Sequence, residues 1–220
     1  MSWRFITCTA LFVTCLLTAN VTASKLVTAG SLTLTAGIVI FPISYILGDV
    51  LTEVWGYTAT RKVIWLGFAC NVLMVAAIWA GGALPPAPFW KGQAAYEEIL
   101  GQAPRILAAS FVAYLVGEFA NAYVLARLKI ATAGRWLWVR TIGSTVVGEG
   151  LDSLVFVALA FAGTVASGTL IVIFVNQWLV KVVYEAAATP LTYLAVGWLK
   201  ARERIDTYDL HTDFNPLRLS

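Results

Sequence analysis

The chain has 220 residues, of which 60% are hydrophobic and only 12% are charged, and its formal net charge is +3. So few polar side chains cannot cover a soluble globule of this size, which excludes the common classes of soluble enzymes and binding domains. We therefore expect an all-α integral membrane protein, because helices satisfy their own backbone hydrogen bonds in lipid.

Six apolar segments are each long enough to cross a bilayer, which takes about 20 residues. They cover residues 5–23, 32–54, 63–81, 105–127, 137–163 and 169–199. We expect one six-helix transmembrane domain over 1–203 and a polar tail over 204–220, with two inverted halves of three helices as an open arrangement. A cleaved signal peptide at the first segment is disfavoured, because its apolar run of about 19 residues exceeds the usual about 7 to 15.

The connections between these segments carry further signals. Alternating Thr and apolar residues over 25–35 predict a short hairpin or re-entrant turn. Pro42 predicts a kink in the second helix, and Pro190 predicts a kinked or tilted last helix. Residues 82–104 predict a loop with a short amphipathic helix from Gln93 to Gly101.

Lys and Arg residues are distributed unevenly between the two sides of the predicted bundle. Three lie on one side, namely Lys25, Lys91 and Arg105, and eleven lie on the other. Those eleven are Arg4, Arg61, Lys62, Arg127, Lys129, Arg135, Arg140, Lys200, Arg202, Arg204 and Arg218. The positive-inside rule then predicts that both termini are cytoplasmic. No basic face indicates a nucleic-acid partner.

Acidic residues occur inside the apolar segments, where a carboxylate costs about 2.5 to 3.5 kcal/mol at a helix centre. At about 100° per residue they fall on one polar stripe in each of four helices. The stripes contain Tyr45, Asp49 and Glu53; Tyr114, Glu118 and Asn121; Ser144, Glu149 and Asp152; and Gln177, Lys181 and Glu185. We expect these stripes to meet around a shared, hydrated cavity.

Some of these charges have simpler interpretations. Lys181 and Glu185 are spaced to form a local ion pair on one helix. Glu53 and Arg140 lie near helix ends, where their charged groups could reach water. Gly117 and Gly148, each followed by Glu, could serve only close helix packing.

The order of the motifs resembles the bacterial queuosine-precursor transporter family, also called the vitamin-uptake transporters. The resemblance rests on the run from Phe41-Pro42 through Gly48-Asp49 and Thr52-Glu53 to Gly56-Tyr57, on Gly117-Glu118-x-x-Asn121, and on Arg140-Thr141-Ile142-Gly143-Ser144-Thr145 with Gly148-Glu149-x-x-Asp152. It implies a six-helix importer of 7-deazaguanine bases, chiefly 7-cyano-7-deazaguanine and its aminomethyl relative.

We therefore predict a substrate site without a cofactor, a metal or catalytic residues. Its residues are Tyr45, Asp49, Tyr114, Glu118, Asn121, Ser144, Glu149, Asp152, Gln177 and Lys181, and Glu53, Arg140 and Glu185 are candidates for coupling or gating. A carboxylate would accept from the N–H groups of the base, an amide or Lys would donate to its carbonyl, and a Tyr would stack on the ring.

Several alternatives stay open from the sequence. The chain could be proton-coupled, a facilitator, or the substrate-binding subunit of an ATP-driven complex, and it could form a homo-oligomer. Acid-lined helices also fit a cation channel or exchanger. An intramembrane enzyme is disfavoured, because no motif such as H-E-x-x-H is present.

Overall fold

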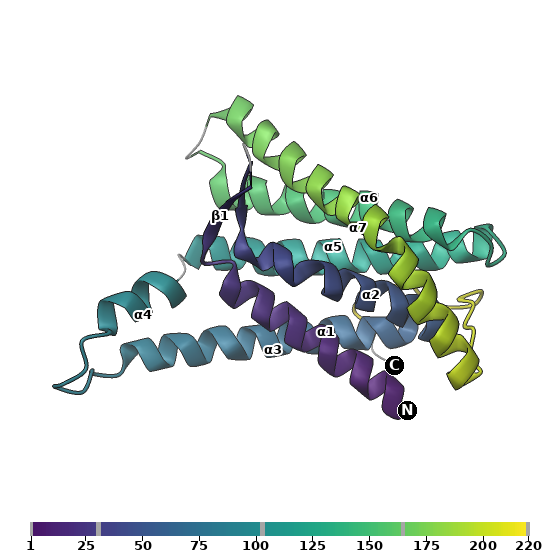
Figure 1. The fold of residues 1–220 in the computed structure, drawn as a ribbon, viewed down its shortest axis with the longest axis horizontal. Coiled ribbons are helices and arrows are strands. Elements are labelled where there is room, and N and C mark those ends of the chain that lie inside the picture. Colours follow the sequence, from purple (N-terminus) through teal and green to yellow (C-terminus); the bar gives the residue numbers. More distant parts are fainter. Residues whose placement is uncertain (1, 30–31, 102–103, 164–165, 219–220) are drawn as a thin grey trace.

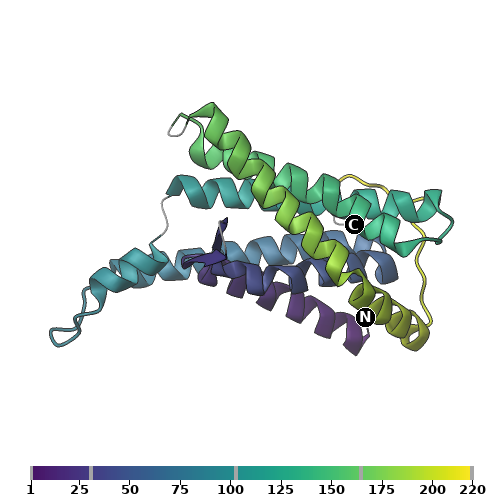
Figure 2. The same ribbon diagram turned by 45° about the horizontal axis from the view of Figure 1, so that its top comes forward.

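The computed structural model describes residues 2–29, 32–101, 104–163 and 166–218, and Figures 1 and 2 show that its long helices form one bundle. The elements are α1 (Trp3–Thr22), β1 (Leu26–Ala29), β2 (Leu32–Thr35), the 3-10 helix η1 (Ala36–Val39), α2 (Phe41–Trp55), α3 (Tyr57–Ala83), α4 (Gln93–Leu100), α5 (Pro104–Ala131), α6 (Leu137–Phe161) and α7 (Ser167–Glu203). The all-α membrane fold predicted from composition is confirmed.

The bundle has two distinct ends (Figure 1). The strands, α4, the end of α6 and the start of α7 lie at one end, which we call the hairpin end. The N-terminus, the junction of α2 with α3 and residues 204–218 lie at the other, which we call the tail end. Both ends of the described chain therefore lie on the same side of the bundle.

Five helices, α1, α3, α5, α6 and α7, are long and apolar enough to span a membrane. Their outward faces carry exposed apolar side chains such as Leu73 and Leu194, which suits contact with lipid. The protein is thus a multi-pass membrane protein. α7 runs unbroken past Pro190 and crosses the bundle obliquely (Figure 1).

α2 is the exception among the predicted spans. It has 15 residues and is about 22 Å long, which is less than the about 30 Å of a hydrocarbon core. The prediction of one helix over 32–54 is wrong, because residues 32–35 pair as a strand and η1 follows. The predicted kink at Pro42 is also wrong: Pro42 lies in the first turn, where its missing N–H costs no hydrogen bond.

The predicted hairpin and amphipathic helix are both confirmed. β1 and β2 pair antiparallel, with Leu26 opposite Thr35, and the turn residues 30 and 31 lie outside the described residues. α4 packs on the end of α3, where the Tyr96 hydroxyl donates to the Ile78 carbonyl at 2.9 Å. These elements cover the hairpin end beside α2, whose helix stops short of it.

α5 and α6 pack against each other through the two Gly-Glu motifs. A Cβ at Gly117 would lie 2.6 Å from the Cβ of Asp152, and a Cβ at Gly148 would lie 2.6 Å from the Cβ of Asn121. Each motif therefore places its glycine against the last residue of the other motif. The backbones approach this closely only because both positions lack a side chain.

Residues 204–218 are irregular, as predicted, but they fold back onto the tail end. α2 and α3 are joined at Gly56, whose positive φ of 81° suits glycine. Asp209 from the tail accepts a hydrogen bond from the Tyr57 backbone N–H at 3.0 Å and so caps α3. Arg61 donates to the carbonyls of Asp213 and Asn215. The tail is part of the packed structure.

Candidate functional site

A cavity of about 610 Å³ lies between the helices in the half of the bundle nearer the hairpin. Thr35, Ile38 and Glu98 in its wall come from the hairpin, η1 and α4. Seven of the predicted site residues line it, namely Tyr45, Tyr114, Glu118, Glu149, Asp152, Gln177 and Lys181. The polar stripes of α2, α5, α6 and α7 thus meet around a common space.

Lys181 organises the charges on the α6 side of the cavity. Its ammonium lies 2.8 Å from Glu149 Oε2 and donates a hydrogen bond to Asp152. Glu149 and Asp152 lie three residues apart and so share one face of α6. The alternative of a local Lys181–Glu185 pair is wrong, because Lys181 reaches across to α6. The Lys181 side chain is 20% exposed, so a ligand in the cavity can reach it.

Glu118 projects into the same cavity from α5, but its surroundings differ from those of Glu149 and Asp152. Its carboxylate makes no hydrogen bond or ion pair with any residue in the described part of the chain. One of its oxygens would lie 3.6 Å from a Cβ at Gly48, so α2 packs directly beside it. Among the described residues, the cavity therefore offers the Glu118 carboxylate without a partner and a lysine that already pairs with two carboxylates.

Two aromatic rings form a stacked pair in the α2 wall. The rings of Phe41 and Tyr45 lie 6.0 Å apart at an interplanar angle of 10°. The Tyr45 side chain also lies near Glu149, which places the pair beside the charged side of the cavity. Tyr114 lies in the wall as well, but its hydroxyl is already used as a donor to the Ile64 carbonyl at 3.1 Å.

Three residues predicted for the substrate site are not among those that line the cavity. The Asn121 amide donates to Asp49 Oδ1 at 2.8 Å, and both side chains are buried. The Ser144 hydroxyl is fully buried and donates to the Thr141 carbonyl of its own helix. Glu185, predicted for coupling, is 1% exposed and also lies outside the wall. These residues form the layer below the cavity, toward the tail end.

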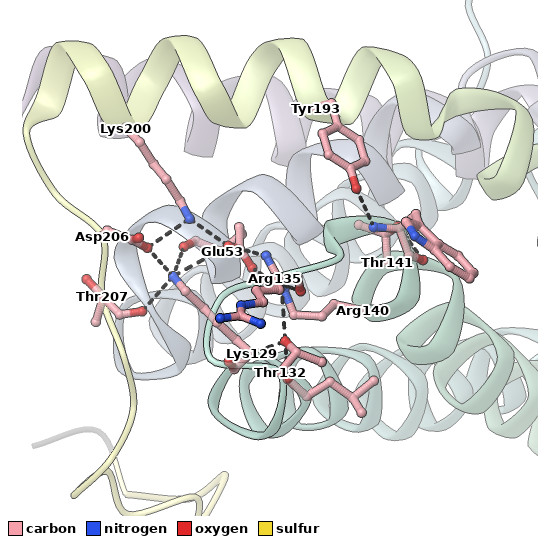
Figure 3. Close-up of polar contacts among 12 residues, drawn as sticks. Glu53, Lys129, Thr132, Arg135, Arg140, Thr141, Tyr193, Lys200, Asp206 and Thr207 are labelled. Atoms are coloured by element: carbon pink, nitrogen blue, oxygen red, sulfur yellow. Dashed lines mark hydrogen bonds and ion pairs between the residues drawn. The ribbon is translucent and has the colours of Figure 1, made fainter.

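At the tail end, Glu53 is surrounded by cations (Figure 3). Arg140 donates to both of its oxygens, at 2.9 and 3.1 Å, and Lys200 donates to one of them at 2.6 Å. Lys129 lies 3.5 Å away and donates to the Glu53 backbone carbonyl. Glu53 is 0% exposed, so the alternative that its charged group reaches water near a helix end is wrong.

The tail completes this cluster through Asp206, which accepts from Lys129 at 2.5 Å and lies 2.8 Å from Lys200. Partial burial opposes ionisation of Asp206, but hydrogen bonds and charge from the two lysines outweigh it and lower its pKa below the ordinary 3.8. The Thr207 carbonyl accepts a further bond from Lys129. We call Glu53, Lys129, Arg140, Lys200 and Asp206 the tail-end cluster.

Comparison with known proteins shows to which family the chain belongs. Residues 35–195 match the family described as "Putative vitamin uptake transporter". The chain belongs to this family. It is 30% identical over 187 residues to a protein of Bacillus subtilis (strain 168) named "Probable queuosine precursor transporter", covering 84% of this chain and 82% of that protein.

A second relative, from Escherichia coli (strain K12), is named "Queuosine precursor transporter". It is 28% identical over 121 residues, which cover 55% of this chain and 52% of the relative. No solved structure matches the chain significantly. The family match includes α2 to α6 and most of α7, and therefore every residue of the cavity discussed above.

Sequence reasoning missed three members of the tail-end cluster as site residues. The sequence indicates Lys129 and Lys200 only as charges on the positive side of the bundle, and Asp206 only as part of the polar tail over 204–220. Their positions were visible as charges just beyond apolar runs. Their convergence on Glu53 depends on how helices far apart in the sequence pack.

Proposed function

We propose that this chain imports a queuosine precursor, 7-cyano-7-deazaguanine or 7-aminomethyl-7-deazaguanine, across the bacterial inner membrane. The observation that carries the proposal is the acidic cavity, with its single lysine, in a chain whose relatives are named queuosine precursor transporters. Its volume of about 610 Å³ falls within the about 300–1,000 Å³ typical of small-molecule sites. Transport, and not catalysis, is the role that we assign.

Glu118 is our candidate for reading the pyrimidine edge of the base. A carboxylate can accept two parallel N–H bonds from such an edge, and this carboxylate has no competing partner among the described residues. Lys181 keeps a third N–H beyond those used by Glu149 and Asp152, and Gln177 lies in the same wall. Either can donate to the carbonyl of the base.

The stacked pair of Phe41 and Tyr45 supplies a flat apolar surface for the ring. Aromatic stacking of this kind contributes about 0.5 to 1.5 kcal/mol beyond the area buried. Phe41 and Tyr45 lie in the first two turns of α2, which begins at the wall of the cavity and does not extend beyond it. The short α2 therefore provides both the room and the stacking surface.

The orientation that we assign to the bundle follows from the charge distribution. Eleven of the fifteen Lys and Arg residues lie at or near the tail end, which we assign to the cytoplasm. The cavity then faces outward, and the tail-end cluster closes the inner side. Import requires this cluster to loosen once the base is bound.

Uptake of radiolabelled base by bacteria that cannot make the precursor tests the proposal. Glu118→Gln should lower uptake about 10- to 100-fold, because charge-assisted hydrogen bonds contribute about 1.5 to 3 kcal/mol each. Glu97→Gln, on the exposed face of α4, is the matched control and should leave uptake unchanged. Wild-type uptake by both Glu118→Gln and a Glu149→Gln, Asp152→Asn double variant, at equal membrane abundance, would refute the site.

A further inference from the structure

Two acids below the cavity, Asp49 on α2 and Glu185 on α7, are each 1% exposed. One oxygen of each, Asp49 Oδ2 and Glu185 Oε1, has no hydrogen-bond partner in the part of the chain that the structure describes. Buried polar atoms in proteins nearly always have a partner. Both atoms therefore need a hydrogen-bond partner that the described residues do not supply.

The charged groups around this pair are acidic. The negative charge of Glu185 would repel that of Asp49, and so would those of Glu118 on α5 and Glu53 one turn further along α2. On the α6 side, Glu149 acts on Glu185. Two ionised carboxylates in such a medium repel each other and lose their hydration, so the charged pair is strongly disfavoured.

The cations of the neighbouring elements are committed elsewhere. Lys181 pairs with Glu149 and Asp152, and Arg140, Lys129 and Lys200 pair with Glu53. On α1, Arg4 pairs with Glu203, and on α3 Arg61 binds the tail and Lys62 is exposed. No ion pair therefore neutralises Asp49 or Glu185 among the residues that the structure describes.

Asn121 supplies an independent sign of a bound hydrogen. Its amide donates to Asp49 Oδ1 at 2.8 Å, while its own Oδ1 is buried and has no partner in the described structure. An amide oxygen accepts hydrogen bonds and does not donate them. A protonated carboxyl group nearby has the one O–H donor that this arrangement lacks.

We propose that Asp49 and Glu185 hold one proton between them, with the Asn121 amide oxygen as a further acceptor, and that this proton moves inward with each molecule of substrate. The inference rests on the proposed transport function. The proton binds a carboxylate oxygen from the cavity side, past Glu118 or Glu149, and leaves toward Glu53 and the tail end. A neutral base then carries one positive charge across the membrane.

Purified protein in liposomes tests this with two assays on the same variants. Counterflow of labelled deazaguanine needs only binding and exchange, whereas accumulation under an inward pH gradient needs proton release. Asp49→Asn and Glu185→Gln, which fix the neutral form of each side chain, should retain counterflow and lose gradient-driven accumulation. Glu97→Gln should keep both activities.

Three results would overturn the proposal. The first is that both variants still accumulate the base in response to the pH gradient. The second is that a sodium gradient drives accumulation in place of the pH gradient. The third is that variants that unfold at the wild-type temperature lose counterflow and accumulation equally. Absence of counterflow in the wild type would instead refute the proposed substrate. In that case the proton site is tested by thermal unfolding in detergent between pH 5 and pH 9. The unfolding temperature of the wild type should change with pH, and those of both neutral variants should change less.

Discussion

The two ends of the bundle balance their buried charges in opposite ways. At the tail end, one carboxylate, Glu53, is bound by three cations, and Asp206 supplies a second anion. In the cavity, one cation, Lys181, serves two carboxylates while Glu118 has no partner among the described residues. The tail end is complete within the chain, whereas the cavity needs a ligand to complete it. A cluster whose partners all come from the chain is thus suited to holding helices together, whereas a carboxylate without a partner among the described residues is suited to binding a ligand.

Glu53→Gln should have the largest effect, because it breaks the complete end. Removing one partner from a buried ion cluster costs about 3 to 5 kcal/mol, since the remaining charges stay buried. We expect little folded protein in detergent, measured by size-exclusion chromatography and thermal unfolding. Lys181→Gln, at the incomplete end, should lower the folded yield less, because the Lys181 and Asp152 side chains are 20% and 24% exposed. Equal yields for the two variants would remove the contrast between the ends.

Gly148→Ala tests the α5–α6 contact that separates the cavity from the layer below it. The new Cβ would lie 2.9 Å from both the Asn121 Cα and the Gly117 carbonyl oxygen, so backbone must shift. Overpacking of this kind costs about 1 to 3 kcal/mol. The control is Gly197→Ala on α7, where no atom lies within 4 Å. Wild-type unfolding temperatures for both variants would show that the close approach is not required.

Asp209→Ala should remove the cap that the tail provides for α3. Loss of a capping side chain costs about 1 kcal/mol, and Gly56 has no side chain to replace it. Amide exchange at Tyr57 should accelerate, measured by hydrogen–deuterium exchange with mass spectrometry, while peptides from the middle of α3 stay protected. Unchanged exchange at Tyr57 would mean that the tail does not hold this helix end.

Asp206→Asn should have the smallest effect, and the effect should depend on pH. The folded-state pKa of Asp206 lies below 3.8, so its charge stabilises the fold above that value and stops doing so as pH falls through the lowered pKa. Its side chain is 45% exposed, so we expect less than about 1 kcal/mol at pH 7. The difference in unfolding temperature from wild type should shrink in acid. A difference that grew in acid would contradict this assignment.

Periodicity and composition predicted the membrane class, the hairpin, α4 and the meeting of four polar stripes, because these depend on local patterns. The start of α2 was missed because the Thr-rich segment before Pro42 is apolar enough to read as helix. The partners of Lys181 and Glu53 were missed for another reason: Lys181 could reach Glu185 or α6, and only the packing of α6 against α7 decides between them. The cavity residues lie on regular stripes and were therefore easier to predict from the sequence than the buried residues in the layer below the cavity.

The tail also has a consequence for how the membrane protein is made. Lys129 and Arg140 are synthesised long before Lys200, Asp206 and Thr207, so the tail-end cluster can be completed only after α7 has been made. A nascent chain halted after α6 would hold Glu53, Lys129 and Arg140 but would lack Lys200 and Asp206, which bind them from α7 and the tail. Synthesis through residue 207 is therefore the step that lets this end of the bundle adopt its packed arrangement.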